Sequence, residues 1–167
     1  MKAKRRRSTS FAGRFAAVAL AAVLRCASAA AADSDTAGVL NANAQFYAAL
    51  NAIFAGDVVP MQRVWSHSDD VTYMGPTGGF DRGWNAVLKN WAGQAALKLG
   101  GRVEPAEMQV TVGQALAVVS DYEQGENTNA DGKVARVQLR ATNLFRKEAG
   151  HWRMIGHHTD LLPYLAK

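Results

Sequence analysis

The chain has 167 residues, with 19 Lys and Arg against 14 Asp and Glu, a net charge of +5 and one Cys. This length gives one domain with its own core and excludes a two-domain dinucleotide enzyme or a barrel enzyme. A single Cys excludes a disulfide framework and zinc sites built from several cysteines. A basic balance ordinarily indicates nucleic acid or an anionic membrane as partner, so the location of the basic residues matters.

The first 32 residues have the pattern of a cleavable signal peptide. Basic residues are concentrated between Lys2 and Arg7, and the apolar run Phe15–Leu24 is too short for a permanent membrane anchor. Ala-x-Ala patterns follow, and cleavage after Ala32 fits best. Polar residues follow Arg6-Arg7, which favours the general secretory route over the twin-arginine route. We therefore expect export to a periplasmic or secreted location.

Removing this leader changes the charge of the protein. Residues 1–32 hold seven of the basic residues, no acidic residue and the only cysteine, Cys26. The remainder keeps 12 basic against 14 acidic residues, a net charge of −2. Nucleic acid therefore loses its main support as a partner, and cysteine chemistry is excluded. We expect a short disordered start at 33–37 and one domain over 38–167.

Helical periodicity opens this domain, and strand periodicity follows. Apolar spacing predicts a helix over 38–55, a short second helix capped by Asp57, and a third helix over about 83–99. A short extended segment at 71–74 and a loop at 75–79 lie between the second and third helices. After Gly101 the pattern has period two, and it predicts strands at 108–112, 115–126, 133–147 and 151–159. This order predicts an α+β fold in which three N-terminal helices pack on a curved, mainly antiparallel sheet, leaving a conical pocket.

The segment 139–160 (LRATNLFRKEAGHWRMIGHHTD) carries a resemblance to a known family. It resembles the C-terminal hairpin of the SnoaL-like, ketosteroid-isomerase-like branch of the nuclear transport factor 2-like superfamily. Segments 55–57, 65–73 and 83–84 are similar to the N-terminal half of that branch. The resemblance covers about residues 38–163 and implies a cystatin-like cone. It does not select a function, because the superfamily contains isomerases, cyclases, dehydratases, binding modules and oligomerisation domains.

A short turn in the last hairpin predicts that Phe145 lies opposite Met154 and that Asn143 lies opposite Gly156. Side chains alternate along a strand, so this register predicts three polar groups on an otherwise apolar inner face: Asn143, His158 and Asp160. The outer face is mixed, and the resemblance implies a homodimer through it.

His158 and Asp160 are the candidate catalytic residues. Two residues apart on one strand, a carboxylate can raise the pKa of an imidazole and fix its tautomer, which suits a general base. The alternative is a structural, hydrogen-bonded polar pair.

Aromatic side chains are the candidate lining of an apolar pocket, with Asn143 as a hydrogen-bonding group. Tyr73 ranks first, because it precedes the loop at the expected mouth. Asp121 and Tyr122 alternate, so at most one of them faces inward. The alternative for each aromatic residue is ordinary core packing. The candidates are Trp65, Tyr73, Trp84, Trp91, Tyr122 and Phe145.

Metal and cofactor sites are not predicted. His157 and His158 point to opposite faces of a strand, and His67 with Asp69-Asp70 lacks a ligand spacing. The resemblance to ketosteroid isomerases also fails at two positions. Their acidic base before a Pro is Gly75 here, and their oxyanion Tyr is Ala49, with Tyr47 pointing elsewhere on the helix.

Three functions follow from these observations. The leading hypothesis is an exported domain whose conical pocket binds a small, largely apolar molecule. The second is a cofactor-free enzyme of the isomerase, dehydratase or cyclase type, with His158 as base and Asp160 orienting it. The third is a dimerisation or assembly domain with a vestigial pocket.

Overall fold

The computed structural model describes residues 13–128 and 131–161, with side chains described from Asp33 on. The chain divides into two compact units after Asp35. The elements in chain order are α1 (Gly13–Phe54), α2 (Val59–Val64), β1 (Thr72–Gly75), β2 (Gly78–Arg82), α3 (Trp84–Leu97), β3 (Arg102–Val112), β4 (Leu116–Thr128), β5 (Val134–Glu148) and β6 (His151–Leu161).

The first unit contains the helical residues 13–35, and residues 1–12 of the predicted leader lie outside the described part. In that described part, no helix has the length and hydropathy needed to cross a membrane. The prediction of a disordered start at 33–37 is wrong, since these residues are helical. Alanine has the highest helix propensity, and the alanine-rich sequence before them continues the helix.

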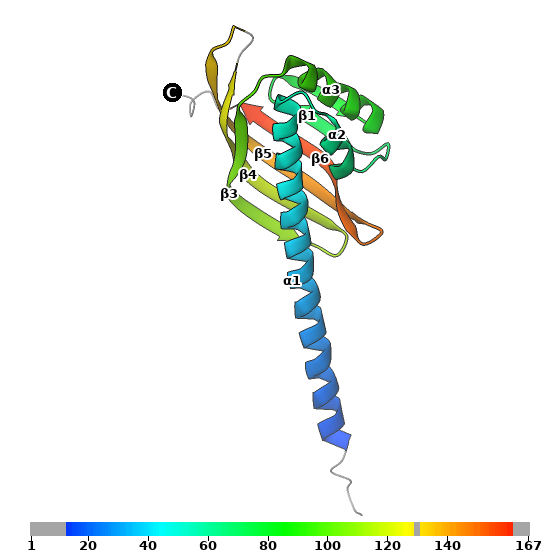
Figure 1. The fold of residues 1–167 in the computed structure, drawn as a ribbon. Coiled ribbons are helices and arrows are strands. Elements are labelled where there is room, and N and C mark those ends of the chain that lie inside the picture. Colours follow the sequence, from blue (N-terminus) through cyan, green and yellow to red (C-terminus); the bar gives the residue numbers. More distant parts are fainter. Residues whose placement is uncertain (1–12, 129–130, 162–167) are drawn as a thin grey trace, which may run out of the picture. The chain divides into compact units, whose positions relative to one another are not determined.

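The second unit is a six-stranded sheet in the order β2-β1-β6-β5-β4-β3, with helices on one face (Figure 1). The neighbouring strands are antiparallel except β1 and β6, which are parallel, so the prediction of a mainly antiparallel sheet is confirmed. Part of the predicted loop after β1 folds back as β2. Because α3 follows β2, only α1 and α2 precede the sheet, and the prediction that all three helices are N-terminal is wrong.

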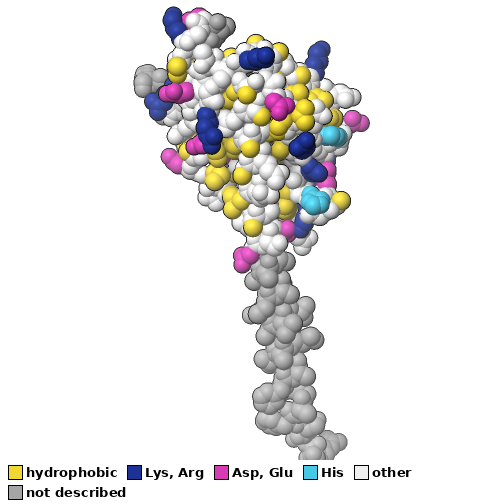
Figure 2. Space-filling model, viewed as in Figure 1, with side chains coloured by type: hydrophobic (Ala, Val, Ile, Leu, Met, Phe, Trp, Pro, Cys, Tyr) yellow, Lys and Arg dark blue, Asp and Glu magenta, His cyan; other side chains and the backbone are white. Residues whose placement is uncertain are grey.

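The core lies between the helices and the inner face of the sheet. Its largest side chains, each under 2% exposed, include Phe46 of α1, Trp65, Trp91 of α3, Phe145 of β5 and Met154 of β6. On the face seen in Figure 2, acidic and basic side chains of the described residues are interspersed rather than gathered by sign.

The β5–β6 hairpin contains a bulge that resets its register. Phe145 pairs with Met154 as predicted, but its neighbour Leu144 pairs with Gly156. Ile155 is therefore an extra residue in β6, opposite no residue of β5. A bulge of this kind shifts by one residue which side chains of the bulged strand face each side of the sheet.

This shift exchanges the inner and outer residues at the end of β6. Asn143 pairs with His157, and Ala141 pairs with Thr159. His157 and Thr159 are buried, whereas the side chains of His158 and Asp160 are 45% and 52% exposed. The predicted inward orientation of His158 and Asp160 is therefore wrong. They form a pair 3.3 Å apart on the outer face.

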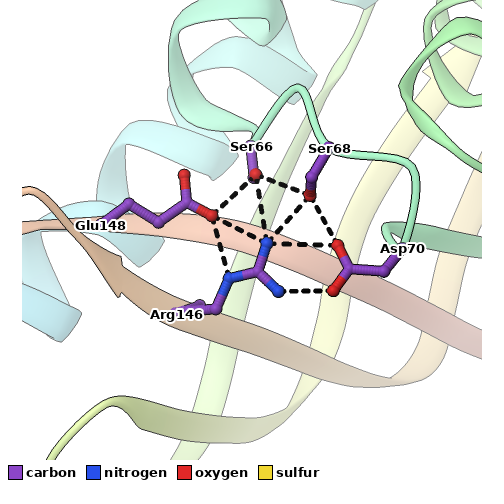
Figure 3. A network of polar contacts seen from close by, with 5 residues as sticks. All are labelled: Ser66, Ser68, Asp70, Arg146 and Glu148. Carbon is purple, nitrogen blue, oxygen red and sulfur yellow. Dashed lines mark hydrogen bonds and ion pairs between the residues drawn. The ribbon is translucent and has the colours of Figure 1, made fainter.

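A polar cluster around Arg146 ties the segment between α2 and β1 to the end of β5 (Figure 3). The Arg146 guanidinium donates to both carboxylate oxygens of Asp70, at 2.6 and 3.1 Å, and to Glu148 at 2.9 Å. It also donates to Ser68 at 2.9 Å, and Ser66 donates to Glu148 at 2.8 Å. The Arg146 guanidinium and the Ser68 hydroxyl lower the pKa of Asp70 to about 2.

Replacing Arg146 tests this cluster. Arg146→Met removes several charge-assisted hydrogen bonds at once, so we expect a loss of about 1–3 kcal/mol of unfolding free energy at pH 7, measured by urea denaturation. The folded-state pKa of Asp70 lies below its ordinary value of 3.8. The stability that ionised Asp70 contributes to the fold is therefore lost as the pH falls from 3.8 through about 2. In Arg146→Met, the unfolding free energy should depend less on pH in this acidic range.

Arg102→Met is the matched control. Arg102 pairs with Glu104 on the surface, where the side chains are 73% and 62% exposed, so its loss should change little. Equal stabilities for the two variants would show that the Arg146 cluster does not hold the fold.

Candidate functional site

A cavity of about 620 Å³ lies between the C-terminal turn of α1, α3 and the inner face of the sheet. Apolar side chains form most of its wall: Leu50, Phe54, Trp91, Leu99, Val103, Val137 and Leu139. Polar side chains also line it, one of them the cationic Arg136: Tyr73, Thr77, Asn90, Gln94, Glu123, Asn127, Arg136, Gln138, His157 and Thr159. An apolar wall with a few converging polar groups is typical of small-molecule sites.

The predicted aromatic lining divides into three groups. Tyr73 and Trp91 line the cavity, as predicted. Trp65, Trp84 and Phe145 are buried in the adjoining core and do not line it. Tyr122 is half-buried between the inward residues Asp121 and Glu123 of β4, so alternation turns it to the outer face. The predicted pocket role of Tyr122 is therefore wrong.

Gly75 allows the Tyr73 hydroxyl to occupy the end of β1. A Cβ on Gly75 would lie 2.5 Å from Tyr73 Oη, and Gln94 Nε2 donates to this hydroxyl at 2.9 Å. Burial raises the pKa of Tyr73 to about 12, so the phenol stays neutral. The position where ketosteroid isomerases carry an acid thus holds no side chain here, and a neutral hydroxyl fills the space.

His157 is held in one tautomer by a chain of amides. Asn143 Nδ2 donates to Asn43 Oδ1 at 2.9 Å, which assigns Asn143 Oδ1 as the acceptor facing His157 Nδ1 at 2.6 Å. Nδ1 therefore carries the proton, and Nε2 keeps a lone pair. Complete burial lowers the pKa of His157 to about 3, so the ring is neutral at neutral pH. Asn143 does not line the cavity, but it orients the histidine that does.

Glu123 lies beside the free nitrogen of His157, with Oε1 3.7 Å from Nε2. Its Oε1 atom is buried and has no hydrogen-bond partner in the described part of the chain. Burial and then the charge of Asp121 raise the pKa of Glu123 to about 8, so it carries a proton at neutral pH. Glu123 and His157 thus present one hydrogen-bond donor and one hydrogen-bond acceptor, and neither side chain is charged.

The sequence contains signals for these two residues. A glycine inside a strand is typical of a bulge, and Gly156 follows two consecutive apolar residues, Met154 and Ile155, where strict alternation would place one. A bulge there turns His157 inward. For Glu123, the alternation that starts at the apolar residues of β4 and continues through Asp121 indicates an inward side chain.

The described residues do not form a metal site. In the ranges that the structure describes, no three His, Cys, Asp or Glu side chains lie close enough together to hold an ion.

The sequence profile of the SnoaL-like domain family matches residues 39–162, and the chain belongs to this family. No curated protein matches the sequence.

Solved structures share the fold. A dehydratase candidate of the NTF2-like family from Streptomyces avermitilis has 22% identity and a TM-score of 0.71, over 78% of this chain and 98% of its own. A ketosteroid isomerase candidate from Shewanella frigidimarina has 20% identity and a TM-score of 0.60, over 72% and 92%. A candidate calcium/calmodulin-dependent protein kinase type II association domain from Thiobacillus denitrificans has 26% identity and a TM-score of 0.58, over 72% and 92%.

Other similar structures are named for the NTF2-like superfamily and the cystatin-like fold, which confirms the predicted cystatin-like fold.

The protonation of Glu123 has a measurable consequence for stability. Between its ordinary pKa of 4.5 and its folded-state pKa of about 8, the folded chain holds a proton that the unfolded chain releases. Stability therefore falls as the pH rises through this window. Glu123→Gln should remove this fall, measured by urea denaturation between pH 5 and pH 8.

The exposed variant Glu126→Gln on the same strand is the control and should keep the slope of the unmodified chain. If Glu123→Gln also keeps it, Glu123 is ionised in the folded protein.

Proposed function

We propose that this domain binds a small, largely apolar molecule that presents an acceptor oxygen to Glu123. The observation that carries the proposal is the cavity of about 620 Å³ with an uncharged donor–acceptor pair, Glu123 and His157, in an apolar wall. A cationic ligand would leave its water shell without an opposite charge in the described part of the wall, where the charged side chain is Arg136, whereas a neutral molecule loses little.

Acetylnaphthalene, a flat neutral ketone, is the probe for this proposal. It should quench tryptophan fluorescence, because Trp91 lines the cavity. Ala135→Phe puts a ring at a half-buried position of the wall and should weaken binding by about tenfold or more. Ala115→Phe, at an exposed turn outside the cavity, should bind as the unmodified chain does. Equal binding by both variants would place the ligand elsewhere.

The same pair supports a second function, proton transfer without a cofactor. His157 Nε2 accepts a proton from a carbon next to a carbonyl, and the C–H electron pair becomes a C=C bond. The Glu123 hydroxyl donates to the carbonyl oxygen, which takes up the displaced electron pair. Return of the proton to another carbon gives an isomerase, and loss of a β-hydroxyl as water gives a dehydratase. The neighbours described as dehydratase and ketosteroid isomerase candidates fit this reaction class.

Exchange of the acetylnaphthalene methyl protons with deuterated water, followed by NMR, tests this chemistry. Glu123→Gln and His157→Gln should each slow the catalysed exchange by about 100-fold or more, because each removes one proton carrier. His158→Gln should leave it unchanged, since His158 lies on the outer face. Loss of exchange in His158→Gln alone would restore the original assignment of His158 and Asp160.

We also propose that the domain acts outside the cytoplasm as a homodimer. The leader pattern of residues 1–32 supports export. The outer face of the sheet, with the exposed Leu144 and the Arg140–Asp160 ion pair, supports pairing of two copies. An assembly role is the alternative, and the association-domain neighbour favours it. The open cavity favours ligand binding, because an assembly domain has no need of one.

A further inference from the structure

Two buried carboxylates lie next to each other on the inner face of β4. Asp121 is 6% exposed and Glu123 is 3% exposed. Tyr122, which lies between them in the sequence, turns outward, so the two carboxylates share the inner face. Each keeps one oxygen, Asp121 Oδ2 and Glu123 Oε1, that is buried without a hydrogen-bond partner among the described residues. Two carboxylates this close cannot both be ionised cheaply in a dry interior.

The Tyr47 hydroxyl decides which carboxylate is ionised. Its single proton is donated to Asp121 Oδ1 at 2.8 Å, so Asp121 is the acceptor. Tyr47 also lies near Glu123 and lowers the pKa of that carboxyl, but by less than burial and the charge of Asp121 raise it. The hydrogen bond from Tyr47 therefore stabilises the anion at Asp121, and that anion disfavours a second one at Glu123.

We propose that Asp121, acting with the Tyr47 hydroxyl, is a positioning residue that keeps a proton on Glu123, so that the cavity accepts ligands with an acceptor oxygen and rejects cations. This inference rests on the proposed function and names the ligand chemistry of the same cavity. Asp121 does not line the cavity, so it acts only through Glu123.

The other groups around Glu123 do not supply this effect. His157 of β6 and Tyr73 of β1 are both neutral at neutral pH. On β5, the residues opposite Asp121 and Glu123 are the uncharged Ala141 and Leu139, and on β3 the residue opposite Glu123 is Pro105. Gln94 of α3 carries no charge, and Arg136 of β5, which lines the same cavity, is a cation and would lower the pKa of Glu123 rather than raise it. The anion of Asp121, with its pKa raised by burial to about 6, is the charge that faces Glu123.

NMR titration of the full chain with labelled Asp and Glu carboxyls measures the proposal directly, with Glu123→Gln assigning the signal. Asp121→Asn should lower the titration midpoint of Glu123 by about one pH unit or more, because a neighbouring anion disappears. Asp160→Asn removes the same charge from the outer face and should leave that midpoint in place. An unchanged midpoint in Asp121→Asn would overturn the proposal.

Two further signals separate this charge effect from loosening of the fold. In Asp121→Asn, loosening would hydrate His157 and raise its midpoint, whereas loss of a negative charge does not raise it. Tyr47→Phe removes the donor to Asp121, so the midpoint of Asp121 should rise, whereas loosening would lower it. A raised His157 midpoint or a lowered Asp121 midpoint contradicts the proposal.

A second experiment compares the binding of a neutral ligand with that of a cationic ligand. The unmodified chain should bind acetylnaphthalene in preference to naphthylmethylamine, a cation of the same ring, and Asp121→Asn should narrow that preference by about tenfold at pH 7. If neither probe binds but the titrations come out as expected, the proposed binding function fails and the role of Asp121 stands. If both probes bind equally to the unmodified chain, the proposed selection against cations is wrong.

Discussion

One extra residue in β6, Ile155, determines the chemistry of this domain. Without the bulge, strand alternation would turn His158 toward the helices and His157 toward the outer face. With it, His157 meets Asn143 and Glu123 inside the fold. The bulge is possible because Gly156 has no side chain, which lets its backbone come close to β5 and β1. A Cβ at this position would lie 2.9 Å from a Leu144 methyl and 3.3 Å from the Thr72 hydroxyl.

Burial of the inward polar groups explains their protonation states. A charge in a dry interior is costly, so each group adopts its neutral form unless a partner compensates. Among the described residues, His157 has an amide oxygen but no anion within hydrogen-bonding distance, and it stays neutral. Asp121 alone receives a phenolic proton, and it is the group that ionises near pH 6. The result is a cavity in which Glu123 and His157, side by side, offer one donor and one acceptor without charge, and in which Arg136 is the charged side chain among the described residues of the wall.

The sequence predicted the architecture better than the site. Periodicity is a property summed over many residues, so the helix at 83–99 and the strands at 115–126, 133–147 and 151–159 were predicted to within a few residues. The starts of two elements were wrong, since α1 begins at Gly13 and not at 38, and β3 begins at Arg102 and not at 108. The side-chain orientation at the end of β6 depends on one residue of register, and a single bulge reverses it. Tyr73 and Trp91 were correctly placed, Tyr73 because it precedes the loop at the mouth and Trp91 because it lies on the apolar face of α3. Tyr47 was missed because helical spacing gives a face and not a hydrogen-bond partner 74 residues away.

The position of the acidic residue in the sheet also determines what can control its protonation. In the ketosteroid isomerase pattern an acid stands at the end of β1, next to a loop, but Gly75 occupies that position here and Tyr73 fills its space. Glu123 instead lies on β4, which is paired with β5 along its length and with β3 except opposite Asp121, where the register of β3 shifts. A side chain on an interior strand has fixed neighbours at the positions two residues away and across the sheet. Asp121 is such a neighbour, so the backbone itself fixes the distance between the two carboxyl groups, and no loop motion is needed to keep Glu123 protonated.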